Sequence, residues 1–152
     1  MSEVTLELVQ ARQAELAQLI EQLTRGPITS THLILPEAAI ELAPGEHYAG
    51  AVLDEQGHVL HHLVLMAAKP DSELAWQAAM DWAASVGGAL PTRQEQALLY
   101  ANCKPHLEPA WHWSSETEGS SYAWGCYFYY GNLYSSYRSY EGSAVAVRRF
   151  TA

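Results

Sequence analysis

The first part of the chain carries an apolar stripe at helical spacing. The stripe consists of Val9, Leu16, Leu19, Ile20 and Leu23. Its repeat predicts a helix over residues 4–24, which the Gly26-Pro27 pair then ends. Two roles are open for this helix. It packs onto its own domain, or it is a short oligomerisation helix of about three heptads.

Two apolar segments with a turn between them follow the helix. Residues 48–53 and 58–67 are rich in aliphatic side chains, and residues 54–57 read Asp-Glu-Gln-Gly. Apolar runs of this length on either side of a glycine-containing turn predict a β-hairpin. A short apolar run at residues 32–36 precedes them.

The middle of the chain predicts two more helices. Asp71 or Ser72 is expected to cap the first, which continues to about Ser85 and ends at Gly87-Gly88. Thr92 and Glu95 have the spacing of a capping box, so the second helix should run over residues 93–102. The side chains expected to face inward from this second helix are Ala97, Leu98 and Ala101.

The pattern changes after Pro109. Seven of the nine tyrosines fall between Tyr122 and Tyr140, among many serines and glycines. Short strands are expected at residues 111–114, 122–129 and 144–150, with long loops between them. Two helices followed by an antiparallel sheet give an α+β fold. We divide the chain into an N-terminal helix, residues 1–26, and a domain over residues 27–152.

Charge and composition exclude several classes of function. The chain of 152 residues has a formal charge of −9 and only eight basic residues, so we expect no nucleic-acid partner. The N-terminal residues lack a basic region followed by an apolar run, and no stretch is long enough to cross a membrane. We therefore expect cytoplasmic synthesis without a signal peptide and no membrane insertion. Cys103 and Cys126 are expected to be buried free thiols, and a disulfide between them is the less favoured alternative.

Patterns for metal binding and catalysis are weak. His58 and His62 would lie on one face of a strand and His61 on the other, with the outer pair about 13 Å apart, too far to share an ion. Neither a phosphate-binding glycine loop nor a nucleophile elbow is present in the sequence. We expect no metal, no cofactor and no enzymatic activity.

Three segments together resemble a known family. They are Gly88-Ala-Leu-Pro-Thr-Arg-Gln-Glu95, Trp111-His-Trp-Ser-Ser-Glu116, and the Tyr122-Ala-Trp124 motif with the terminal Ala-Val-Arg-Arg strand at residues 146–149. Over about residues 44–150 the chain resembles prophage and bacterial domains with a C-type-lectin-like fold. The resemblance implies two helices and an antiparallel sheet with long loops, preceded here by an N-terminal helix.

Some members of that family are variable proteins of diversity-generating retroelements. In them, copying errors at template adenines rewrite codons near the 3′ end of the gene into Asn, Tyr, Ser, Gly, Asp or His. Residues 125–143 consist largely of these residue types, and the resemblance implies a variable region at about residues 113–145. The chain departs from the commoner family pattern at Gly142-Ser143 and Val145.

The composition of this region also favours recognition without reference to the family. Tyrosine offers large, stiff contact surfaces, and serine and glycine offer adaptable hydrogen bonding, as in antibody paratopes. We therefore expect noncovalent binding of a macromolecular ligand, with a protein as the favoured class. The alternative is an assembly subunit of a prophage particle that uses the same surface as a fixed interface, and in either case a homo-oligomer is compatible with the sequence. The expected ligand contacts are Gly125, Tyr127, Tyr129, Tyr130, Asn132, Tyr134, Ser135, Ser136, Tyr137, Ser139 and Tyr140.

Overall fold

In a computed structural model of the chain, residues 4–24 and 37–151 are described. The chain divides into two units, residues 1–36 and 37–152. The first contains helix α1, Leu6–Thr24, which confirms the predicted N-terminal helix. The predicted end of that helix at Gly26-Pro27, the apolar run at residues 32–36 and the proposed boundary after residue 26 lie outside the described residues.

The apolar stripe of α1 is not covered by the described residues of its own unit, residues 4–24. None of its residues is buried, and Leu16, Leu19, Ile20 and Leu23 are each more than half exposed. No described helix is long and apolar enough to cross a membrane.

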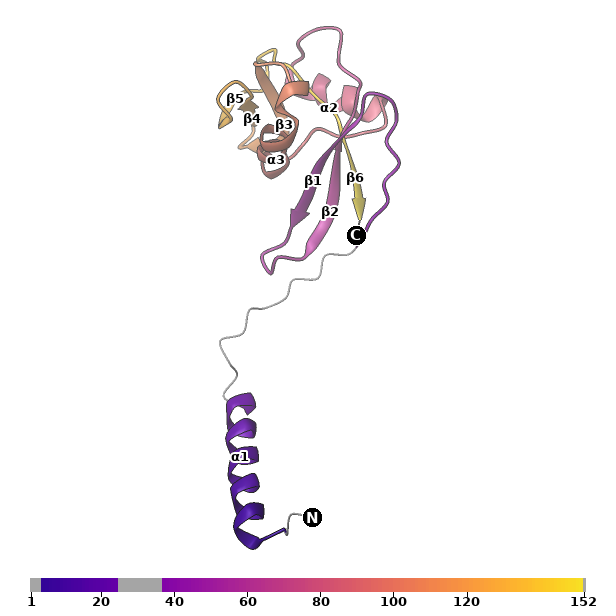
Figure 1. The fold of residues 1–152 in the computed structure, drawn as a ribbon. Coiled ribbons are helices and arrows are strands. Elements are labelled where there is room, and N and C mark those ends of the chain that lie inside the picture. The colour runs from indigo at the N-terminus through magenta and orange to yellow at the C-terminus, as the bar shows by residue number, and fades with distance from the viewer. Residues whose placement is uncertain (1–3, 25–36, 152) are drawn as a thin grey trace. The chain divides into compact units, whose positions relative to one another are not determined.

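The second unit is α+β, as the sequence predicts, but it holds two three-stranded sheets where one was expected (Figure 1). The first sheet has the order β1-β2-β6, with β1 at His47–Leu53, β2 at Val59–Leu65 and β6 at Val147–Thr151. The second has the order β3-β4-β5, with β3 at Trp111–Glu118, β4 at Tyr122–Tyr127 and β5 at Asn132–Tyr137. All strand pairs are antiparallel.

Strand β5 is the element that the sequence pattern did not predict. Its residues Asn-Leu-Tyr-Ser-Ser-Tyr bury little on either face, so no hydrophobic alternation marks it. It forms because its backbone pairs with β4, from Tyr122 opposite Tyr137 to Tyr127 opposite Asn132. The bounds of the predicted strands also shift: β3 continues to Glu118, β4 ends at Tyr127 and β6 begins only at Val147.

Helix α2, Trp76–Ser85, begins later than predicted, and neither Asp71 nor Ser72 caps it. The N-cap residue is Ala75, whose side chain makes no capping hydrogen bond. The reason lies just upstream: the backbone N–H and C=O of Leu74 both pair with Gly142, at 2.8 and 2.9 Å. This bridge keeps the chain extended up to the start of the helix.

Helix α3, Arg93–Cys103, begins with the predicted capping box, but its buried face differs from the prediction. Ala97 and Ala101 are exposed and Leu98 is only half-buried. The buried residues are instead Glu95, Gln96, Leu99 and Cys103. The helix lies between the two sheets in Figure 1, and one core cluster joins its Leu99 and Cys103 to residues of both sheets. A 3₁₀ turn, Lys104–His106, follows it.

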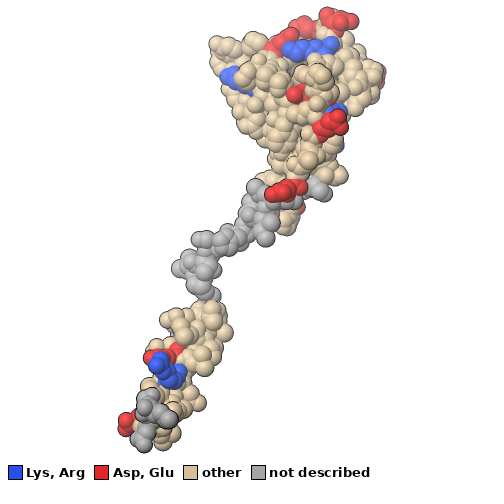
Figure 2. Space-filling model, turned by 45° about the vertical axis from the view of Figure 1, so that its right-hand side comes forward, with Lys and Arg blue, Asp and Glu red and all other residues tan. Residues whose placement is uncertain are grey.

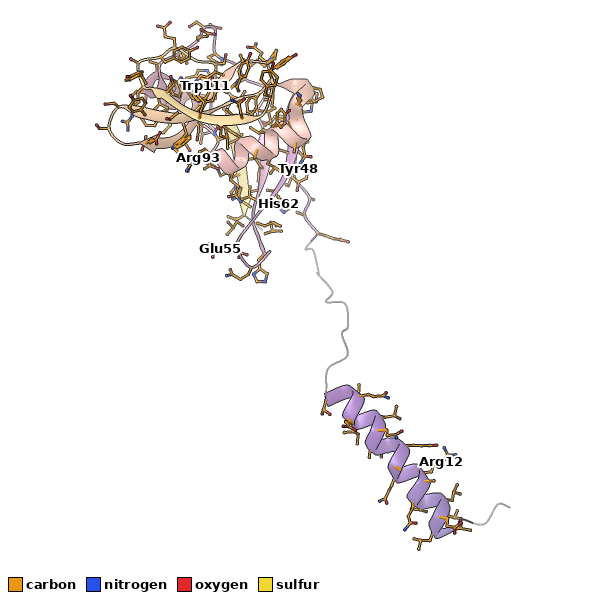
Figure 3. The ribbon with its side chains drawn as sticks, turned by 90° about the vertical axis from the view of Figure 1, so that its left-hand side faces the viewer. Arg12, Tyr48, Glu55, His62, Arg93 and Trp111 are labelled. Atoms are coloured by element: carbon orange, nitrogen blue, oxygen red, sulfur yellow. The ribbon has the colours of Figure 1, made fainter. Side chains whose placement is uncertain are left out.

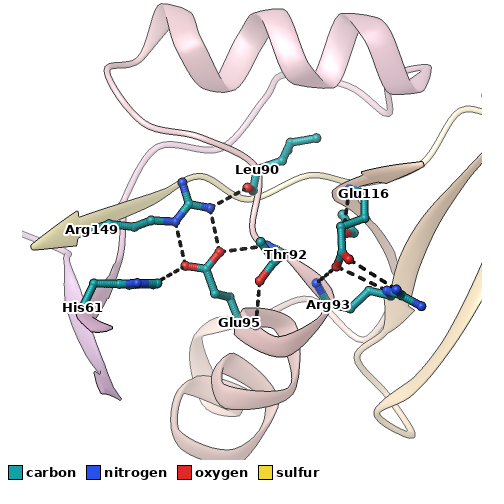
Figure 4. Close-up of polar contacts among 8 residues, drawn as sticks. His61, Leu90, Thr92, Arg93, Glu95, Glu116 and Arg149 are labelled. Carbon is teal, nitrogen blue, oxygen red and sulfur yellow. Dashed lines mark hydrogen bonds and ion pairs between the residues drawn. The ribbon is translucent and has the colours of Figure 1, made fainter. Parts of the chain in front are cut away.

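Glu95 lies on the buried face of α3 and forms several hydrogen bonds to other parts of the domain (Figure 4). This carboxylate is fully buried and accepts hydrogen bonds from Arg149, at 2.6 and 2.7 Å, from the Thr92 backbone N–H at 2.9 Å and from His61 at 2.9 Å. Burial by itself raises the pKa of Glu95, but the bonds from Arg149, Thr92 and His61 outweigh it and the pKa lies below its ordinary value. The network ties α3 to β2 and β6.

The adjacent arginines of β6 have different partners. Arg149 binds Glu95. Glu116 pairs with Arg93, which also lies 4.3 Å above the Trp124 ring. Arg148 pairs with Glu46, so the two arginines have partners on different parts of the domain.

Candidate ligand-binding surface

Two tryptophans of β3 form the base of the tyrosine-rich region. Trp111 and Trp113 are 6% and 0% exposed, and their rings meet edge to face at 5.7 Å. Figure 3 labels Trp111 within the β3-β4-β5 layer. The Trp113 indole N–H donates to the Leu74 carbonyl at 2.7 Å, and the Trp76 indole N–H donates to the Ser114 carbonyl at 2.9 Å. These bonds join the sheet to the segment that contains α2.

Two glycines make room for the Trp111 ring. A Cβ atom at Gly125 would lie 2.3 Å from Trp111 Cζ2, and one at Gly142 would lie 2.6 Å from Trp111 Cδ1. Only glycine fits at such distances without displacing the ring. Gly125 is therefore buried framework, unlike the other ten predicted contacts, which are half-buried or exposed.

The remaining ten predicted contacts do not share one face of the sheet. Strand alternation places Tyr127, Asn132, Tyr134 and Ser136 on the face that also bears Trp111. Ser135 and Tyr137 point to the opposite face, where Tyr137 lies 4.6 Å from Tyr122. Tyr129, Tyr130, Ser139 and Tyr140 lie in the turns that precede and follow β5, so Tyr129 does not continue the strand face of Tyr127.

Five tyrosines nevertheless form one group, which we call the tyrosine surface: Tyr127, Tyr129, Tyr130, Tyr134 and Tyr140. The Tyr127 ring lies 6.3 and 5.9 Å from those of Tyr129 and Tyr130, which are 4.6 Å from each other. Tyr134 stacks at 4.2 Å on Trp111, and Tyr140 meets Trp113 at 6.4 Å. The two buried indoles thus connect Tyr134 with Tyr140, and Tyr127 packs against the core cluster that contains both indoles.

The outer parts of these rings are accessible. Tyr129, Tyr130, Tyr134 and Tyr140 are 53%, 71%, 44% and 51% exposed. Among the described residues, the five hydroxyl groups of the tyrosine surface have no hydrogen-bond partner. Burial, followed by the proximity of Tyr140 and Tyr127, raises the pKa of Tyr134 above its ordinary value, so this hydroxyl stays protonated at neutral pH and can donate.

Charged side chains contribute little around this region. On the face of the molecule drawn in Figure 2, most of the surface is uncharged, and the acidic and basic side chains form separate small groups. Arg138 is the one basic residue within residues 122–145, and it is engaged locally. It donates to the Gly119 and Tyr122 carbonyls, at 2.6 and 3.1 Å, and lies 4.9 Å from the Trp76 ring. Contacts made by the tyrosine surface would therefore rest on aromatic area and neutral hydrogen bonds.

The histidines and cysteines considered as metal ligands have separate surroundings. His61 binds Glu95, His62 binds the Tyr48 hydroxyl at 2.7 Å, and His58 lies 3.5 Å from Asp54 in the β1–β2 turn. Figure 3 labels Tyr48 and His62 in the layer of β1 and β2. In residues 4–24 and 37–151, no three His, Cys, Asp or Glu side chains are grouped so as to hold a metal ion.

Both cysteines are free and buried. Burial raises the pKa of the Cys103 thiol and raises that of Cys126 to about 11. Each therefore stays a protonated thiol at neutral pH, packed in the core cluster that joins α3 to both sheets.

Comparison with known proteins adds no assignment. No protein-family model matches the chain, and no curated protein matches it.

Proposed function

We propose that this protein binds a protein ligand noncovalently through the tyrosine surface, and that its scaffold is a C-type-lectin-like domain of the kind diversified by retroelements. The observation that carries the proposal is the group of five clustered tyrosines whose rings are accessible and whose hydroxyls are unpaired among the described residues. Accessible aromatic clusters of this kind are typical of interaction sites.

The available area sets the scale of the interaction. With about 200 Å² for a fully exposed tyrosine, the four most exposed rings present on the order of 400 Å². A standard interface takes about 800 Å² from each partner, so the tyrosine surface supplies roughly half. Asn132 and Ser139, both exposed, extend it, and Ser136 lies half-buried on the same sheet face.

Weak binding by one domain would be offset if several copies were held together. The apolar stripe of α1, which the described residues of its own unit do not cover, supports a role for this helix in association between copies of the chain, because a helix with such a stripe normally buries it against a partner. In this proposal α1 sets the number of copies and the second unit supplies the binding surface. The protein is not an enzyme in this proposal.

The decisive test is the DNA around the gene. We expect a near-copy of the sequence that encodes about residues 113–150, next to a reverse-transcriptase gene, differing mainly where the copy has adenine. The structure sharpens this expectation, because the differing codons should fall on accessible positions such as Tyr129, Tyr130 and Tyr134 and should avoid Trp111 and Gly125. A locus without such a copy refutes the retroelement origin.

A second test measures tolerance in the protein itself. Replacing Tyr129, Tyr130 and Tyr140 together by serine should leave a cooperative melting transition near that of the unchanged chain. Replacing the framework residues Gly125 and Gly142 by alanine should not, because both glycines hold Trp111 in place. If the triple tyrosine variant unfolds, these rings stabilise the domain itself, and the proposal that they form a surface free to bind a ligand is refuted.

A further inference from the structure

The second unit has a cavity that none of the eleven predicted contacts lines. A cavity of about 240 Å³ opens between three segments of the chain: residues 69–73 before α2, Glu108 and His112 around the start of β3, and residues 143–145 before β6. This volume is below that of a drug-sized pocket, so it suits a metabolite of few atoms.

His112 is the buried polar side chain of this cavity. It is 2% exposed, and its Nδ1 lies 2.8 Å from the Ala110 carbonyl oxygen. A carbonyl can only accept, so Nδ1 carries the proton and Nε2 of the neutral ring has a free lone pair. Burial, with a smaller contribution from the nearby Lys69 ammonium, lowers the pKa of His112 against the opposing effects of Ala110 and Glu108, which keeps the ring neutral at pH 7.

The Nε2 atom has no partner among the described residues. Among the described residues, three side-chain atoms without a hydrogen bond are fully enclosed: His62 Nε2, Gln96 Oε1 and Trp111 Nε1. His112 Nε2 is not one of these enclosed atoms. It therefore combines an unused lone pair with some access to solvent. In a residue that lines a cavity, such an atom is placed to accept a hydrogen bond from a bound molecule.

The rim of the cavity is charged and unpaired. Asp71, Glu73, Glu108 and Lys69 are exposed, and none of them forms a hydrogen bond or ion pair with another described residue. Elsewhere in the same unit, Glu46, Glu95 and Glu116 are each bound to an arginine. Three carboxylates against one ammonium give the rim an excess of negative charge, which attracts cations.

We propose that this cavity binds a small organic ammonium compound, whose ammonium group lies among the rim carboxylates and donates a hydrogen bond to His112 Nε2. Lys69 would accommodate a carboxylate if the ligand also carries one, as an amino acid does. This site is independent of the tyrosine surface, so it can be present whether or not that surface binds a protein.

The test is a ligand titration of the ¹⁵N-labelled full chain, monitored by NMR through its imidazole and backbone resonances. The probes are putrescine, which has two ammonium groups, L-lysine, which adds a carboxylate, and sodium acetate. We expect saturable shifts at His112 and at residues 69–73 and 143–145 with at least one of the two amines, in the millimolar range or tighter. Acetate alone should cause none. Stronger binding of L-lysine than of putrescine identifies an amino-acid-like ligand, and the reverse identifies a simple amine.

Two matched variants separate the cavity from general attraction to an acidic chain. Glu108→Gln removes a rim carboxylate and should weaken amine binding about two- to fivefold, the usual range for a solvent-exposed charge pair. Glu55→Gln removes the same charge in the β1–β2 turn, where Figure 3 labels Glu55, and should change nothing. The proposal is overturned if neither amine gives saturable shifts, if the shifts map elsewhere, or if both variants weaken binding equally.

Discussion

Substitution of Glu95 by glutamine should destabilise the domain more than any other single carboxylate change that we consider. The carboxylate is fully buried and accepts four hydrogen bonds, two from Arg149 and one each from Thr92 and His61. A glutamine side chain keeps the volume but replaces one acceptor oxygen by an NH₂ group, which then faces a donor. It also leaves the Arg149 charge without a counter-ion.

The size of the effect follows from the burial of each partner. Breaking a buried ion pair by removing one member costs about 3–5 kcal/mol. The side chain of Arg149 is 34% exposed, so water can solvate part of its charge once Glu95 is neutral. We therefore expect the lower part of the range, about 3 kcal/mol, measured as the free energy of unfolding in urea by tryptophan fluorescence. Glu118→Gln, an exposed carboxylate on β3, is the matched control and should change the free energy by less than about 0.5 kcal/mol.

The pH dependence gives the same argument a second readout. The pKa of Glu95 is lowered in the folded state, so its contribution to stability is fully present above the unfolded value of about 4.3 and is lost as the pH falls through the folded value. The unchanged chain should lose stability on acidification more steeply than the Glu95→Gln variant. Equal unfolding free energies at pH 7, or parallel pH profiles below pH 5, would refute the view that this network stabilises the fold.

Three further predictions concern other parts of the molecule. Trp111→Phe should lower the free energy of unfolding in urea by at least about 1 kcal/mol less than Trp113→Phe does. The reason is that the buried Trp111 N–H has no acceptor among the described residues, whereas the Trp113 N–H donates to the Leu74 carbonyl. Similar losses of unfolding free energy in the two variants would contradict this. Leu16→Glu should reduce the mass of the full chain in size-exclusion light scattering from that of an oligomer to that of a monomer, and an unchanged mass would remove α1 from the association. Cys103 and Cys126 should react with a thiol reagent at pH 8 only after unfolding in urea, since burial raises both pKa values; rapid reaction of the folded chain would show that they are accessible.

Local signals in the sequence predicted the elements well where the signal was complete within a few residues. The capping box of Thr92 and Glu95 placed the start of α3 correctly, and the heptad stripe placed α1. The start of α2 was wrong because a distant residue decides it: Gly142 pairs with the Leu74 backbone and holds the chain extended up to Ala75. A capping signal at residues 71–72 could not reveal that contact.

The inward face of α3 was wrong for a related reason. Hydrophobicity favours burial of Ala97, Leu98 and Ala101, whereas the helix buries Glu95 and Gln96. A buried carboxylate is tolerable only when partners satisfy it, and those partners, His61 and Arg149, come from strands far away in the sequence. The one signal available was the adjacent pair Arg148-Arg149, since alternating strand residues must point to opposite faces and one of them needed a partner inside the domain.

The candidate site was predictable in composition but not in geometry. The density of tyrosine and serine indicated a recognition surface, yet the pairing of β4 with β5 decides which residues share a face. It separates Tyr137 from Tyr134, and it places Gly125 beneath Trp111. The cavity around His112 had no sequence signal at all, because its lining comes from three segments that only the fold brings together.

The energetics of the tyrosine surface differ from those of the framework below it. Trp113 and Trp76 are held by hydrogen bonds to backbone carbonyls, and Trp111 is held by close packing against two glycines, so none of these anchoring contacts requires a tyrosine hydroxyl. A ring that is about half exposed in the free domain contributes only part of its burial energy to folding, whereas the same ring enclosed by a ligand contributes about 1–2 kcal/mol or more to binding. Changes at Tyr129, Tyr130 or Tyr140 would therefore alter binding more than stability. That difference is the physical condition under which a surface can change its residues, and its ligand, while the fold persists.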